Sequence, residues 1–67
     1  MNNKMTETND EFKRLHLAFE VTLDARDECF KRKKQYPEYK KKFNEMIERY
    51  DKTINELLTL MAELIKK

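Results

Sequence analysis

The sequence lacks glycine and tryptophan, and it has only one proline and one cysteine among its 67 residues. Phosphate-binding loops, dinucleotide-binding fingerprints and two-residue β-hairpins need backbone conformations that glycine supplies. The absence of glycine therefore argues against the common nucleotide-binding enzymes. A single cysteine cannot form a disulfide within the chain, and a lone thiol is typical of a reducing compartment.

Long hydrophobic runs are also missing. The longest apolar-rich run covers residues 57–65, but Thr59 and Glu63 interrupt it and it is too short to cross a bilayer. The first eight residues contain no apolar stretch of the kind found in signal peptides. We therefore expect a cytoplasmic protein that does not contact a membrane.

The length allows one domain, which we expect to span residues 1–67 with a disordered N-terminal tail at residues 1–7. Charged residues make up 42% of the chain and hydrophobic residues 39%. A core of this size contributes only about 3–5 kcal/mol, so small scaffolds depend on disulfides, metals, partners or very regular helix packing.

The hydrophobic pattern predicts a first helix over about residues 9–34. Thr8 and Glu11 have the spacing of a capping box, which marks helix N-termini. Apolar side chains then recur on one stripe with helical period: Phe12, Leu15, Phe19, Leu23 and Phe30. Tyr36 precedes Pro37 and is thereby disfavoured in the α region, so the helix should end near residue 35.

A second helix is predicted over about residues 37–66, with proline in its first turn. Its apolar stripe follows a regular heptad. Position a holds Tyr36, Phe43, Tyr50, Leu57 and Leu64; position d holds Tyr39, Met46, Thr53 and Leu60; position e holds Ile47, Ile54 and Met61. A stripe of positions a, d and e is wide enough for a helical bundle and wider than a two-stranded coiled-coil seam. A short connection makes consecutive helices antiparallel neighbours. The expected fold is thus an all-α antiparallel two-helix hairpin; one kinked continuous helix is the alternative.

The chain carries more apolar side chains than one hairpin can cover. Exposed contiguous apolar surface usually marks an interface. The simplest interpretation is self-association, with two hairpins forming a two-fold symmetric helical bundle, a homodimer. The other is docking on a different, larger protein. Both use the same candidate interface residues: Leu17, Val21, Leu57, Leu58, Met61, Leu64 and Ile65.

Residues 31–42 form a basic segment, here called the basic tip. They carry seven cations and one anion, a net charge of +6, whereas the whole chain is +2 and the remainder is therefore −4. The segment either keeps the turn solvated, binds nucleic acid through cations and stacking tyrosines, or binds an acidic protein surface. Its candidate residues are Lys31, Arg32, Lys33, Lys34, Tyr36, Tyr39, Lys40, Lys41 and Lys42.

Arg26 is a charged residue in the middle of the first apolar stripe, at heptad position a. A polar residue at this position costs stability and can fix register, oligomeric state or a partner contact. Either its aliphatic stem packs while the guanidinium reaches water, or it is buried and pairs with a carboxylate across the bundle. Glu56 and Asp51 lie at the appropriate level for such a pair.

The candidate catalytic groups form no recognisable site. His16 and Glu20 lie one turn apart, but a di-iron bundle site needs repeated Glu-x-x-His motifs and this chain has one histidine. Cys29 has no histidine near it in the chain. We expect neither enzymatic activity nor a cofactor. The expected function is that of a small regulator or inhibitor that docks its helical surface on a larger protein; the alternative is a nucleic-acid-binding regulator that uses the basic tip.

Overall fold

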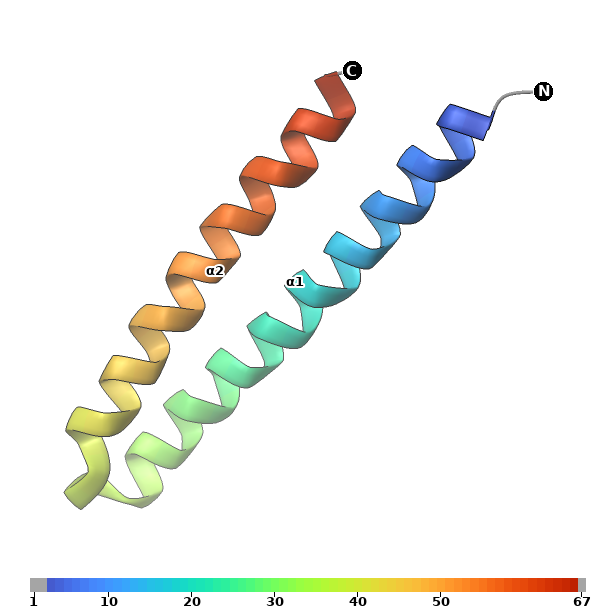
Figure 1. Ribbon diagram of the computed structural model, residues 1–67. Coiled ribbons are helices and arrows are strands. Elements are labelled where there is room, and N and C mark those ends of the chain that lie inside the picture. The colour runs from blue at the N-terminus through green and yellow to red at the C-terminus, as the bar shows by residue number, and fades with distance from the viewer. Residues whose placement is uncertain (1–2, 67) are drawn as a thin grey trace.

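The computed structural model describes residues 3–66, which form two long antiparallel helices side by side (Figure 1). Helix α1 spans Asn3–Gln35 and helix α2 spans Lys40–Lys66, with the short 3₁₀ helix η1 at Pro37–Tyr39 between them. The described residues contain no strand. The predicted all-α helical hairpin is confirmed.

Helix α1 begins at Asn3, earlier than the expected start at residue 9. Thr8 and Glu11 therefore lie within the helix and not at its N-terminus. The expected disordered tail, residues 1–7, overlaps α1 at residues 3–7, and residues 1–2 lie outside the described part of the chain. The segment 3–8 contains no glycine or proline, and Lys4, Met5 and Glu7 are good helix formers, so nothing in its composition prevents the helix from starting before the capping-box pattern.

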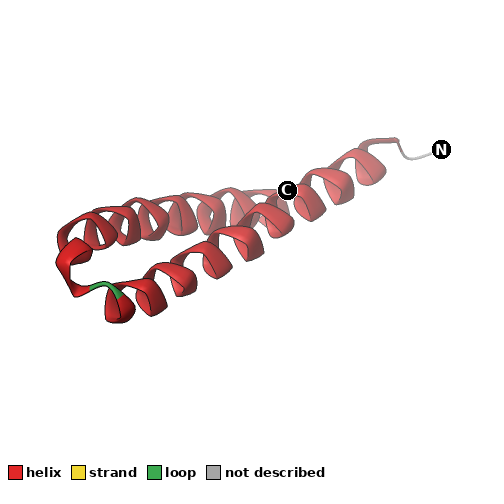
Figure 2. Cartoon of the chain, turned by 90° about the horizontal axis from the view of Figure 1, so that it is seen from below, coloured by secondary structure: helices red, strands yellow, loops and turns green. Residues whose placement is uncertain are grey.

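The connection between the helices is closed by two backbone hydrogen bonds. Tyr36 has φ −127° and ψ 72°, outside the α region, as expected for a residue before proline. Its N–H donates to the Arg32 carbonyl oxygen at 2.8 Å, and the Tyr39 N–H donates to the Tyr36 carbonyl oxygen at 3.0 Å. The chain reverses within this short segment, which Figure 2 shows at the closed end of the hairpin.

The core of the hairpin is small and lies along one line of contact. Its four buried side chains are exposed by 5–8%: Cys29 of α1 and Ile47, Ile54 and Met61 of α2. Helix α2 thus packs through heptad positions a and e. The d positions, expected to share in this stripe, lie beside the line of contact and leave Tyr39, Met46 and Leu60 exposed. Two helices touch along a single line, and a stripe three positions wide exceeds it.

The molecule is elongated, with principal extents of 57 × 15 × 11 Å. Its Cα radius of gyration is 15.8 Å, against about 11 Å for a compact domain of this length. The accessible surface is 5867 Å², whereas a compact monomer of this mass exposes about 4,600 Å². Within the described residues, neither helix is long and apolar enough to span a membrane.

Candidate protein-interaction surfaces

The apolar side chains that the hairpin leaves exposed lie mainly on two opposite sides of it. On α2, Asp51 and Leu60 are nine residues apart, which places them about 180° apart around the helix axis. The buried stripe of α2 runs between these two sides. The described residues contain nine exposed large hydrophobic side chains: Leu17, Val21, Phe30, Tyr36, Tyr39, Met46, Leu58, Leu60 and Ile65.

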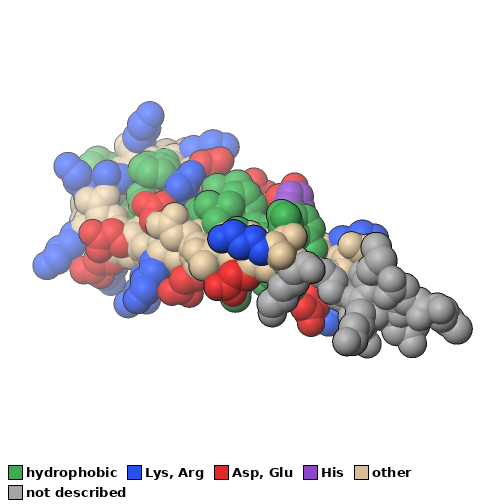
Figure 3. Space-filling view, turned by 90° about the horizontal axis from the view of Figure 1, so that it is seen from above, with side chains coloured by type: hydrophobic (Ala, Val, Ile, Leu, Met, Phe, Trp, Pro, Cys, Tyr) green, Lys and Arg blue, Asp and Glu red, His purple; other side chains and the backbone are tan. Residues whose placement is uncertain are grey.

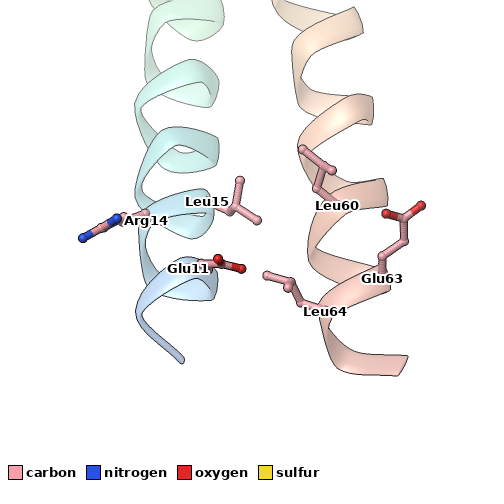
Figure 4. Close-up of a pocket in the computed structure, with 6 residues that line it drawn as sticks. All are labelled: Glu11, Arg14, Leu15, Leu60, Glu63 and Leu64. Carbon is pink, nitrogen blue, oxygen red and sulfur yellow. The ribbon is translucent and has the colours of Figure 1, made fainter. Parts of the chain in front are cut away.

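One side carries an open groove between the helices. Its apolar lining is Leu15 of α1 with Leu60 and Leu64 of α2, and these side chains point into the space between the two helices (Figure 4). Glu11, Arg14 and Glu63 complete the lining and place charges around the apolar floor. The groove lies at the open end of the hairpin, far from the connection.

The same side continues towards the tip along both helices. On this side of α1, Leu15 is followed by the small residues Ala18, Thr22 and Ala25. The Thr22 hydroxyl has its partner within the helix, because Oγ1 donates to the Ala18 carbonyl oxygen at 2.7 Å. On α2, Thr53 and Met46 lie seven and fourteen residues before Leu60 and fall on the same face, and Tyr39 of η1 precedes Met46 by the same spacing. We call this side the groove face; it comprises Leu15, Ala18, Val21, Thr22, Ala25, Tyr39, Met46, Thr53, Leu60 and Leu64.

The opposite side is marked by the ion pair between Arg26 and Asp51. Residues at seven-residue spacing from these two share their faces, which brings Phe12 and Phe19 of α1 to the same side as Leu58 and Ile65 of α2. In the space-filling view, hydrophobic side chains gather beside the histidine and are bordered by acidic and basic groups (Figure 3). We call this side the aromatic face; it comprises Phe12, His16, Phe19, Leu23, Phe30, Leu58 and Ile65.

The Arg26 guanidinium reaches across the hairpin to Asp51. Its Nη1 lies 2.7 Å from Asp51 Oδ1, and the two side chains are 31% and 48% exposed. The Arg26 Nε is buried and has no acceptor within the described residues. Of the two carboxylates expected at this level, the structure thus selects Asp51. Arg26 thus meets parts of both expectations: its aliphatic stem packs and its guanidinium is partly exposed, and the guanidinium also pairs with a carboxylate of α2.

His16 lies on the aromatic face, where it packs against rings and contacts a carboxylate. Its ring is stacked on Phe12 with centroids 6.3 Å apart, and Phe19 follows at 6.4 Å on its other side. His16 Nδ1 lies 3.7 Å from Glu20 Oε1, and both side chains are exposed. Among the described residues, no three His, Cys, Asp or Glu side chains are placed to hold a metal ion.

The seven candidate interface residues do not lie on one surface. Val21 and Leu64 are on the groove face, and Leu58 and Ile65 are on the aromatic face. Leu57 is half-buried at position a of the stripe that packs on α1. Leu17 is exposed on the outer side of α1. Met61 is 6% exposed and packs in the hairpin's own core, so it offers no free surface to a partner.

The basic tip is mostly exposed in the structure. Among its nine candidate residues only Lys33 is half-buried. Arg32 is held by Glu28, with its Nε 3.1 Å from Oε1 one turn earlier in α1. The lysine ammonium groups and the rings of Tyr36 and Tyr39 are therefore accessible to an anionic partner.

Comparisons with protein-family models, with curated proteins and with solved structures found no match for this chain.

The sequence pattern had not separated the groove face from the aromatic face, because it assigned positions a, d and e to one stripe. The signal that distinguishes them is the small-residue row Ala18, Thr22 and Ala25, which has no large side chain to fill the space beside α2.

Proposed function

We propose that this chain is a small non-catalytic interaction protein, a regulator or inhibitor that docks its helical surface on a larger protein partner. The observation that carries the proposal is the excess of exposed apolar surface over buried core. Within the part of the chain that the structure describes, four side chains are buried, whereas nine large hydrophobic side chains are exposed. Apolar side chains that are exposed together on one face are typical of protein–protein interfaces.

The aromatic face is the surface assigned to the partner. It combines aromatic rings, which dominate binding energy at interfaces, with aliphatic side chains at helical spacing. Ile65 is the most exposed of these at 72%, and Phe30 and Leu58 are also exposed. The bordering polar side chains of His16, Glu20, Arg26 and Asp51 would form a polar rim around the apolar contact.

A second candidate function is nucleic-acid binding through the basic tip. It is favoured by the exposure of its lysines and of Tyr36 and Tyr39, since cations neutralise phosphates and rings stack on bases. The remainder of the chain is acidic, and this would repel a long duplex. The two functions differ in salt dependence, because phosphate contacts weaken steeply with salt and apolar docking persists.

The test compares two neighbouring residues of α2. Leu58 lies on the aromatic face, and Thr59 is exposed on the outer side of the same helix turn. The wild-type chain, Leu58→Asp and Thr59→Asp are immobilised and exposed to lysate of the source cell in high salt, and captured proteins are identified by mass spectrometry. A protein retained by wild type and Thr59→Asp but lost by Leu58→Asp is then purified and its binding measured directly. The proposal fails if no captured protein shows this difference or if the purified protein does not bind.

A further inference from the structure

We infer that the groove face binds a second copy of this chain, forming an antiparallel two-fold dimer in which α1 packs on α1 and α2 packs on α2. This inference goes beyond the proposed function and does not depend on it, because it uses the opposite side of the hairpin. Four features of the hairpin support such a dimer: the net charge of the tip, the placement of charged residues around the groove face, the groove itself and the accessible area.

The net charge of the basic tip determines the relative orientation of the two copies in the dimer. With +6 on residues 31–42, a dimer that placed both tips together would bring two strongly basic segments into contact. A two-fold axis across the hairpin's width instead places each tip over the open end of the other copy. That operation stacks each helix on its own equivalent in antiparallel orientation.

The position of the axis follows from the hairpin itself. Val21 lies sixteen residues before Pro37 and Thr53 lies sixteen residues after it, so both are at the same distance from the connection. Both residues are on the groove face, and both are exposed. A two-fold axis at this level passes close to the middle of α1 and the middle of α2. The same axis can therefore pair α1 with α1 and α2 with α2 along most of their lengths.

Charged residues along α2 are self-complementary about this axis. Arg49 and Lys42 lie four and eleven residues before Thr53, whereas Glu56 and Glu63 lie three and ten residues after it. All four occupy position g, beside the exposed d positions Met46, Thr53 and Leu60. In the antiparallel pair, Arg49 meets Glu56 of the second copy, and Lys42 meets Glu63 of the second copy.

Helix α1 has the same property about Val21. Glu11 and Arg14 lie ten and seven residues before it, and Glu28 and Arg32 lie seven and eleven residues after it. Glu28 and Arg32 pair with each other in the single hairpin. In the dimer, Glu11 would meet Arg32 of the second copy and Arg14 would meet Glu28 of the second copy, which extends this pair into a network across the interface. Between these charges the row of small residues, including Ala18 and Ala25, permits close approach of the two α1 backbones.

The second copy also fills the groove. The symmetry brings its Met46 and Tyr39, both exposed in the single hairpin, over the apolar floor of Leu15, Leu60 and Leu64. The hairpin exposes 5867 Å², about 1,300 Å² more than a compact monomer of its mass. Standard interfaces bury about 800 Å² on each partner, so the exposed excess is sufficient for a stable dimer.

The test uses adjacent residues of α2. Leu60 lies on the groove face and Thr59 points to the outer side, and both are exposed, so an added carboxylate at either position can remain hydrated. Light scattering with size-exclusion chromatography at about 100 µM measures molar mass, and circular dichroism measures helicity. We expect wild type and Thr59→Asp at twice 8.3 kDa, and Leu60→Asp at 8.3 kDa with helicity retained. A monomeric wild type, or a dimer that survives Leu60→Asp, overturns the inference.

A charge exchange tests the register even if Leu60→Asp fails to fold. Arg49→Glu places like charges opposite each other twice in the symmetric dimer, and we expect the dissociation constant to rise about tenfold. The double variant Arg49→Glu/Glu56→Arg restores both pairs and should return the wild-type value. Within one helix the double variant instead adds repulsion, with Glu45 and with Lys52, so rescue reports pairing between copies. Absence of rescue overturns the antiparallel register.

Discussion

At Arg26, a single side chain contributes both packing and an ion pair. Its stem lies in the apolar stripe of α1, and its Nη1 binds Asp51 at 2.7 Å. Asp51 is 48% exposed, so water already screens the pair and limits its contribution to about 1 kcal/mol or less. The buried Nε without an acceptor is a cost that an apolar side chain would not have.

The residue-scale prediction is that Arg26→Leu raises the melting temperature. Leucine fills the stripe beside Phe19 and Phe30, removes the buried Nε and leaves Asp51 accessible to water. Asp51→Ala, the matched control, removes the same ion pair without improving the packing and should lower the melting temperature slightly. Thermal unfolding and molar mass are measured on the same samples. A large fall for Arg26→Leu at unchanged mass would contradict this account of the ion pair.

At the scale of the helices, the sequence predicted the elements better than their faces. Helical period, the charge-rich end of α1 and Tyr36–Pro37 determine two helices and the reversal between them. The carboxylate partner of Arg26 was also restricted correctly to two candidates by level. The choice between positions d and e on α2 could not be predicted, because Met46 and Ile47 are both apolar and only the path of α1 across α2 decides which of them is covered.

The start of α1 was misplaced because Thr8–Glu11 resembles a cap although helix-compatible residues precede it.

The element-scale prediction concerns the basic tip. Reversing Lys34, Lys40 and Lys41 to Glu should leave helicity nearly unchanged, because all three side chains are exposed around the connection. If the tip binds nucleic acid, binding of a single-stranded oligonucleotide in low salt is lost in this variant. The control reverses Lys13, Lys52 and Lys66, which are exposed elsewhere and change the net charge equally. Equal loss in both variants, or no binding by wild type, would reject the nucleic-acid function.

At the scale of the whole molecule, the two sides of one hairpin have different proposed roles: the groove face binds a second copy, and the aromatic face binds the partner protein. In the antiparallel dimer the groove faces are covered, and the two aromatic faces remain exposed on opposite sides of the bundle. Such a dimer would present two equivalent docking surfaces to its partner. Leu58→Asp should therefore abolish docking and leave the dimer intact, whereas Leu60→Asp should abolish the dimer; Thr59→Asp should preserve both.

The central claim is that one hairpin is incomplete and is stabilised by association. The most direct measurement is the melting temperature of the wild-type chain over a hundredfold range of protein concentration. Association of the folded hairpins raises the melting temperature with concentration, by up to about 10 °C over this range for a dimer of this length. A melting temperature independent of concentration, together with a molar mass of 8.3 kDa throughout, would contradict the account.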